Sequence, residues 1–257
     1  DGALASRDLN MERLKREDGE TIAYLARDGK PPGILWLGGF KSDMTGTKAT
    51  ALGEWAAREG RALVCFDYFG HGQSSGDFRK GTISRWRDDA LAMIDKLTKG
   101  PQILVGSSMG GWIAMLAALA RPERVAGMML LAPAADFTEK LMWAHMEDDV
   151  KRQIMEKGEW EWPSDHDEDP YPITRVLIED GRKNLILDGP LAFNFPVRIL
   201  QGMKDPDVPW MHAVKTVERI EGDVTLTLIK NGDHRLSNPP DIARMIAALE
   251  GLIANIK

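Results

Sequence analysis

The sequence has a single cysteine in 257 residues, so it cannot form an internal disulfide. Cys65 lies in the apolar run Ala62-Leu63-Val64-Cys65-Phe66, which indicates a small buried hydrophobe and not a reactive thiol. A chain without disulfides fits a reducing compartment. We therefore expect a cytoplasmic protein.

The sequence also lacks long apolar runs and an excess of basic residues. No stretch approaches the roughly 20 apolar residues that cross a bilayer, and residues 1–8 have no signal-peptide core. Lys and Arg total 33 against 39 for Asp and Glu, which gives a net charge of −6. This balance disfavours a nucleic-acid partner. We expect no transmembrane segment and no nucleic-acid binding.

The chain does have the material and the pattern of an α/β protein, with 43% hydrophobic residues. Asp18-Gly19 separates two alternating segments within residues 11–28, which predicts an antiparallel pair at one sheet edge. From Gly33 onward, short apolar runs alternate with helical segments, which is typical of a mostly parallel sheet flanked by helices. The predicted strands are residues 34–37, 62–66, 102–105, 128–131, 197–200 and 224–229. The predicted helices are residues 48–59, 84–98, 111–120, 211–220 and 241–256.

Residues 137–190 interrupt this alternation. They are rich in Trp, Met and acidic residues, contain several prolines, and show no clear strand. Because the alternation resumes at Phe195, we interpret residues 137–190 as a lid inserted into one domain that spans residues 1–257. The lid is expected over the carboxyl ends of the strands.

The sharpest chemical signal is Gly106-Ser107-Ser108-Met109-Gly110, a G-x-S-x-G between a predicted strand and a predicted helix. A nucleophile at the centre of this motif sits on a strained turn, where larger flanking side chains would collide. A serine hydroxyl needs a histidine base, and that base needs an acid to fix its tautomer. We therefore predict Ser108 as the nucleophile and look for its two partners.

Five histidines are available, and His234 is the one in the expected position for the base. In this topology the base follows the nucleophile and the acid, and it lies between the last strand and the last helix. His71 precedes Ser108 and is excluded on that ground. His145 and His166 lie in the insertion, and His212 lies within a predicted helix.

The acid follows the penultimate strand, where Asp205 and Asp207 are both available. Asp205 comes first at the end of the strand and is the predicted acid. Asp207 precedes Val208-Pro209 and is interpreted as a solvated or turn-capping carboxylate. Asp233 is too close to His234 along the chain to reach around its ring.

Acyl transfer also needs two backbone N–H donors for the developing oxyanion. One should be the amide of Met109, which follows the nucleophile. The other should come from the loop Leu37-Gly38-Gly39-Phe40, and we predict the amide of Phe40 because Gly39 permits the turn.

Two other candidate sites are rejected. The segment Asp67-Tyr68-Phe69-Gly70-His71-Gly72-Gln73-Ser74 has neither a G-x-G-x-x-G nor a Walker lysine, so it is not interpreted as a phosphate loop. Its glycines are expected to shape a loop beside the active site. The acidic residues around His166 lack metal-site spacing. We predict no metal and no cofactor.

Motifs in the right order give the chain a resemblance to a known family. The motifs are Asp67 to Ser74, the Ser108 turn, Gly202-Met203-Lys204-Asp205 with Val208-Pro209, and Asp233-His234. Together they resemble the α/β-hydrolase superfamily across nearly the whole chain. The resemblance implies an α/β-hydrolase fold and a Ser108, Asp205 and His234 triad.

Longer matches are similar to the mitochondrial palmitoyl-protein thioesterase and acyl-glucuronide esterase subgroup. They are Gly46-Thr47-Lys48-Ala49, the run from Gly100 to Ser108, Gly110-Gly111-Trp112, and Asp233-His234-Arg235. This resemblance implies hydrolysis of carboxylic esters or thioesters, with acyl chains or acyl glucuronides as substrate classes. The partner would then be a small acyl ester or thioester, or an acylated protein.

The predicted function is thus a serine esterase or thioesterase that forms an acyl-enzyme on Ser108. Gly39, Trp112 and Trp143 are candidate substrate-pocket residues, although tryptophans at such positions are more often core. A peptidase or a carbon-carbon bond hydrolase is the alternative enzyme, because the same triad serves those reactions. A ligand-binding receptor without activity is the non-enzymatic alternative.

Overall fold

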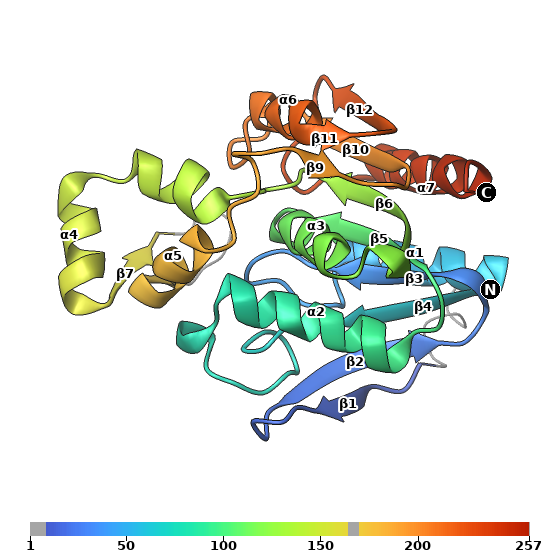
Figure 1. Ribbon diagram of the computed structural model, residues 1–257, viewed down its shortest axis with the longest axis horizontal. Coiled ribbons are helices and arrows are strands. Elements are labelled where there is room, and N and C mark those ends of the chain that lie inside the picture. The colour runs from blue at the N-terminus through green and yellow to red at the C-terminus, as the bar shows by residue number, and fades with distance from the viewer. Residues whose placement is uncertain (1–8, 164–169, 257) are drawn as a thin grey trace.

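The computed structural model describes residues 9–163 and 170–256. Their main feature is a sheet of eight strands in the order β1-β2-β4-β3-β5-β6-β10-β12 (Figure 1). The strands are β1 (Glu12–Lys15), β2 (Thr21–Arg27), β3 (Lys30–Leu37), β4 (Arg61–Phe66), β5 (Gln102–Ser107), β6 (Val125–Leu131), β10 (Val197–Gly202) and β12 (Val224–Ile229). The antiparallel pair β1–β2 forms one edge, and the strands from β4 to β12 run parallel. The predicted fold class, the edge hairpin and the six predicted strands are confirmed.

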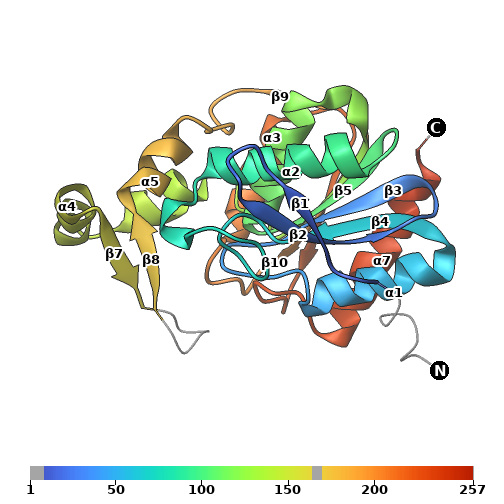
Figure 2. The same cartoon turned by 90° about the horizontal axis from the view of Figure 1, so that it is seen from below.

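Helices cover both faces of the sheet, as α/β architecture requires of a parallel sheet that is apolar on both sides. Figure 2 shows α2 and α3 on one face, and α1 and α7 on the other. The helices of this body are α1 (Thr47–Glu59), α2 (Ile83–Leu97), α3 (Met109–Ala120), α6 (Trp210–Arg219) and α7 (Pro239–Ala254). The 3-10 turns η1 (Phe78–Lys80) and η2 (Pro122–Arg124) and the short parallel pair β9 (Leu191–Ala192) and β11 (Ile220–Glu221) complete it. All five predicted helices are confirmed to within two residues at each end.

Each face has its own apolar core. Trp86 of α2 and Trp112 of α3 are fully buried against one face, while Leu52 of α1 and Leu249 of α7 are buried against the other. Cys65 belongs to the second core and is buried, as its apolar neighbours predicted. Burial raises the pKa of its thiol to about 12, so Cys65 is not a reactive thiolate.

Residues 138–163 and 170–182 form a projecting segment that stands to one side of the sheet in Figure 1. It consists of η3 (Thr138–Met142), η4 (Trp143–His145), α4 (Asp148–Lys157), β7 (Glu159–Trp162), β8 (Tyr171–Thr174) and α5 (Arg175–Arg182). Met146, Ile154, Ile173 and Ile178 form a small separate core there.

The expectation of no strand between residues 137 and 190 is wrong, because β7 and β8 pair antiparallel. Pro172 lies within β8 and made a strand look unfavourable. A two-stranded ribbon consists only of edge strands, and an edge strand tolerates proline.

The parallel strands bring distant parts of the sequence together. Their carboxyl ends lie at the same edge of the sheet, and ligands of open α/β sheets bind at that edge. Ser108 follows β5, Asp205 follows β10 and His234 follows β12, so this edge is where a site is to be sought. In the described part of the chain, no helix is both long and apolar enough to cross a membrane.

Candidate active site

Ser108 lies on a strained turn between β5 and α3. Its φ of 55° and ψ of −118° are rare for a residue with a side chain, and they set its hydroxyl out from the turn. Gly106 and Gly110 make this turn fit. A Cβ on Gly106 would lie 2.3 Å from the carbonyl oxygen of Gly110, and a Cβ on Gly110 would lie 2.0 Å from that of Leu37. Glycine at positions 106 and 110 therefore lets the backbone segments around the turn pack closely, where any Cβ would collide.

The two predicted partners of Ser108, His234 and Asp205, form a continuous chain of hydrogen bonds with its hydroxyl. The Nε2 of His234 lies 3.0 Å from Ser108 Oγ, and Nδ1 lies 2.7 Å from Asp205 Oδ2. A neutral imidazole has one N–H, and an ionised carboxylate can only accept, so Nδ1–H donates to Asp205. Nε2 is then free to accept the proton of the serine hydroxyl.

Asp205 is buried, and its carboxylate is fixed on its other side by the backbone. Oδ1 accepts N–H bonds from Asp207 and Val208, each at 2.8 Å. Gln201 also donates its amide to Oδ2 at 3.2 Å. These bonds hold Oδ2 toward His234, while the side chain of Asp207 is exposed.

The loop after β3 lies beside the nucleophile. A Cβ on Gly39 would be 3.5 Å from the Cβ of Ser108, so this loop passes directly over the serine. Among the described residues, no hydrogen bond from the Phe40 amide is found. Met109 is the first residue of α3, and such an amide has no acceptor within its own helix. Both amides are therefore available as donors near Ser108.

His71 fixes the conformation of the same loop, a role that the sequence analysis missed. Its Nε2 accepts the amide of Lys41 at 3.1 Å, and Nδ1 donates to the Phe69 carbonyl at 3.0 Å. Burial lowers the pKa of His71 to about 4, so the ring is neutral at pH 7, as these two bonds require. Lys41 itself has a φ of 60°. The segment from Asp67 to Ser74 thus supports the loop that passes Ser108 through the His71 ring.

The aromatic residue of the loop, Phe40, is at the centre of a ring cluster. Its ring makes edge contacts with Phe78, Trp86, Phe137 and Tyr171, at centroid distances of 5.1 to 5.9 Å. Tyr171 belongs to the projecting segment, which therefore packs onto the loop that passes Ser108.

The two candidate pocket tryptophans lie in different surroundings. Trp112 is fully buried, donates its indole N–H to the Asn184 carbonyl at 3.1 Å, and packs edge-on against Phe137. Trp143 is half-buried in the projecting segment, with the guanidinium of Arg182 4.8 Å above its ring.

The described residues contain one group of three side chains with metal-binding atoms, and it overlaps the triad. Asp205, Asp207 and His234 offer atoms within 4.8 Å of one another. The carboxylate of Asp205 already accepts hydrogen bonds from two backbone amides and from the Nδ1 of His234. His166 and its acidic neighbours lie outside the described residues.

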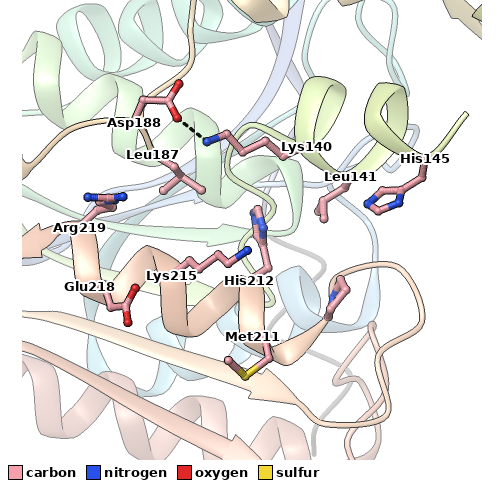
Figure 3. A pocket seen from close by; sticks show the side chains of 11 residues that line it. Lys140, Leu141, His145, Leu187, Asp188, Met211, His212, Lys215, Glu218 and Arg219 are labelled. Carbon is pink, nitrogen blue, oxygen red and sulfur yellow. Dashed lines mark hydrogen bonds and ion pairs between the residues drawn. The ribbon is translucent and has the colours of Figure 1, made fainter.

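A cavity of about 440 Å³ lies between η3, α6 and the segment that precedes β9 (Figure 3). Its wall is connected to Ser108 through two neighbouring alanines. The amide of Ala134 donates to the Ser108 carbonyl at 3.0 Å, and the carbonyl of Ala135 is 2.7 Å from the Nε2 of His212, which lines the cavity.

The chain is similar to known hydrolases in sequence and in structure. The α/β-hydrolase model described as serine aminopeptidase S33 matches residues 38–172. Human mitochondrial palmitoyl-protein thioesterase ABHD10 is 39% identical over 95% of this chain and 80% of its own length. A crystal structure from Agrobacterium vitis S4, described as a hydrolase, is 44% identical with a TM-score of 0.92, covering 98% of this chain and 100% of that one. Mouse α/β-hydrolase domain-containing protein 10 is 37% identical with a TM-score of 0.90, covering 96% and 100%.

One expectation from the sequence is overturned by these relatives. The human, orangutan and bovine proteins, at 39% identity, are named as mitochondrial. The expectation of a cytoplasmic protein is therefore wrong. It rested on the single cysteine, which constrains the redox state of a compartment and not its identity.

Proposed function

Because this chain belongs to the α/β-hydrolase family, we propose that it hydrolyses acyl esters and thioesters through an acyl-enzyme on Ser108. The observation that carries the proposal is the hydrogen-bond chain from Ser108 Oγ through His234 to Asp205, at 3.0 and 2.7 Å. It has the geometry that serine acyl transfer needs before substrate binds.

Each residue of the triad has a distinct role in the proposed reaction. His234 removes the hydroxyl proton as Ser108 attacks the acyl carbon, and Asp205 stabilises the imidazolium that forms. The amides of Phe40 and Met109 donate to the oxyanion. His234 then gives its proton to the leaving alcohol or thiol, and afterwards activates a water molecule that releases the acid. No cofactor takes part.

The proposed acyl group is a long chain, held where the projecting segment meets the loop after β3. Phe40, which follows Gly39 in this loop, packs its ring against those of Phe137 and Tyr171 there. Residues 137–190 would act as the lid, Gly39 would border the acyl carbonyl, and Trp143 would line the outer end. Trp112 would support Phe137 from the core. Relatives named as palmitoyl-protein thioesterases favour this substrate class, and acylated proteins are its macromolecular form.

The decisive experiment compares p-nitrophenyl esters with matched acyl thioesters, from acetyl to palmitoyl, using the wild type and Ser108→Ala. We expect the variant to lose at least about a thousandfold in kcat. A long-chain optimum would support the acyl site, and a thioester preference would support a depalmitoylating enzyme. Equal rates for the wild type and the variant would contradict the proposal.

A second candidate is an aminopeptidase, because the matching family model is described as serine aminopeptidase S33. Amides have poorer leaving groups than thioesters, so the same triad would need a protonated amine to depart. Amino-acid p-nitroanilides, tested beside the esters, separate the two activities. Turnover of the anilides without turnover of the thioesters would favour the peptidase.

A further inference from the structure

Gln201 is a fully buried polar side chain near the carboxyl end of β10, the strand that precedes Asp205. Burying an amide is unfavourable unless its polar atoms find partners. The Nε2 of Gln201 lies 3.0 Å from the Gly202 carbonyl, 3.1 Å from the Val208 carbonyl and 3.2 Å from Asp205 Oδ2. One amide nitrogen therefore contacts both ends of the turn from Gly202 to Val208, and the carboxylate between them.

The chemistry of these three oxygens fixes the orientation of the amide group. Carbonyl oxygens and an ionised carboxylate can only accept hydrogen bonds, so all three need a donor. An amide turned over would place Oε1 against them, with an acceptor facing acceptors. In the described part of the chain, Oε1 has no hydrogen-bond partner. Gln201 therefore acts on the turn through its nitrogen alone.

The turn is attached to the sheet differently at its two ends. Near its start, the amides of Met203 and Lys204 donate to the carbonyls of Ile229 and Gly232, at the end of β12 and just after it. The far end has the Val208 carbonyl, which accepts the Gln201 amide. Because Gln201 lies in β10, this bond attaches the far end of the turn to the sheet.

The carboxylate of Asp205 needs that attachment because its other constraints are local. Oδ1 accepts the amides of Asp207 and Val208, which belong to the same turn and move with it. Oδ2 accepts from His234 Nδ1 at 2.7 Å and from Gln201 at 3.2 Å. Among these donors, Gln201 is the one that lies on a strand of the sheet.

We propose that Gln201 is a positioning residue for the reaction proposed above, acting through Asp205. It holds Oδ2 in place for the Nδ1–H of His234 and holds the far end of the turn through Val208. The inference rests on the proposed function, because it requires Asp205 to be the acid of the triad. Hydrogen bonds to ionised groups are the stronger ones, so the loss of this donor should be measurable in the rate.

The first test compares two buried glutamines. Gln201→Met keeps a side chain of similar length without donors, and should lower kcat on a p-nitrophenyl ester about tenfold with KM unchanged. Gln102→Met is the matched control. Gln102 is 4% exposed and donates Nε2 to the carbonyls of Lys99 and Gly100, at the end of β5 opposite Ser108. It should lose comparable stability in thermal unfolding and keep the wild-type kcat.

A double variant shows whether Gln201 acts through the acid. Gln201→Met/Asp205→Asn should be no slower than Asp205→Asn alone, because the carboxylate on which Gln201 acts is gone. A purely structural role would instead multiply the two losses. The proton of Nδ1–H gives a far-downfield signal in ¹H NMR, which should broaden in Gln201→Met and stay unchanged in Gln102→Met.

Wild-type kcat in Gln201→Met, or losses that multiply in the double variant, would overturn the proposal. If Gln201→Met does not fold, Gln201→Asn takes its place. It keeps an amide that is one methylene too short to reach all three oxygens, and the same loss is expected. The NMR signal can be followed in Ser108→Ala without turnover. Failure of the hydrolase would therefore leave the test of Gln201 intact, and an unchanged signal would overturn its role.

Discussion

The ammonium of Lys48 donates a hydrogen bond to the Ser237 hydroxyl at 3.2 Å, and a second to the carbonyl of Arg235, the residue after the proposed base His234. Lys48 lies in the first turn of α1, which follows the loop that carries Phe40. Burial lowers the pKa of Lys48 to about 8, while the carboxylate of Asp233 acts against this decrease. One side chain therefore connects the loop of His234 with the helix that follows the loop of Phe40.

We expect Lys48→Met to lower kcat about tenfold with little change in KM, because the base would lose a constraint while the acyl site remains. A loss of about one charge-assisted hydrogen bond corresponds to that factor. Steady-state kinetics on a p-nitrophenyl ester measures it. Lys48→Arg keeps the donor and should recover part of the rate, and Lys230→Met, at an exposed lysine of the same loop, should have no effect. Equal losses in Lys48→Met and Lys230→Met would contradict the role.

The two aspartates after β10 should differ sharply. Asp205→Asn replaces the acceptor of Nδ1–H by an amide and favours the wrong tautomer of His234, which in such triads costs about ten-thousandfold in kcat. Asp207→Asn changes an exposed side chain and should stay within about twofold. Rates on one activated ester for both variants check this. A comparable loss in Asp207→Asn would reassign the acid.

The triad could be predicted from the sequence because it depends on local signals in a fixed order. A glycine-flanked serine between a strand and a helix, and a histidine between the last strand and helix, need no knowledge of packing. His71 shows the limit of this approach. Its hydrogen bonds to Lys41 and Phe69 depend on how two loops from different strands fold together. Sequence order excluded it as the base, but no local pattern could predict its hydrogen bonds to these two loops.

The projecting segment was harder to predict for a related reason. Pro172 and the alternation Glu159-Trp160-Glu161-Trp162 gave conflicting signals, and pairing with a distant partner decides whether such residues form a strand. The cavity of Figure 3 lies between η3 and α6, whose cavity-lining residues are about 70 positions apart. Only the folded chain brings these elements together.

His71 should make the protein less stable as the pH falls from 6.5 toward 4. In this range the unfolded chain binds a proton that the folded chain does not, so the free energy of unfolding decreases. A folded pKa of about 4 against an ordinary 6.5 corresponds to about 3 kcal/mol once the pH has passed below both values. Urea unfolding at pH 7, 6, 5 and 4 measures the effect.

The comparison variant for this pH effect is His71→Gln, which has no titrating ring. Asp89 acts in the opposite sense between pH 4 and 6, because burial raises its pKa to about 6. The difference between the wild type and the variant therefore carries the test, since Asp89 is present in both. The variant should be less stable at pH 7 but should lose less stability on acidification. Parallel pH dependence in the two proteins would show that His71 is not buried in its neutral form.

Gly110→Ala and Gly251→Ala place the same methyl group in two helices and should have opposite effects. Helix propensity alone favours alanine by about 1 kcal/mol at either position. At Gly251 of α7 nothing lies within 4 Å of the added Cβ, so this gain should appear in full as higher stability. At Gly110 the Cβ would lie 2.0 Å from the carbonyl oxygen of Leu37 and 2.6 Å from that of Gly38, both of them backbone atoms that no side-chain rotation can move. Helix α3 would have to shift away from β3 and carry Ser108 with it, so steric repulsion outweighs propensity.

We expect Gly110→Ala to lose about 3 kcal/mol of stability, at the upper end of the usual cost of overpacking a core. It should also lose most of its esterase activity. Thermal unfolding and ester turnover on both variants decide the matter: a stable, active Gly110→Ala would mean that the close packing of α3 on β3 does not hold the nucleophile in place.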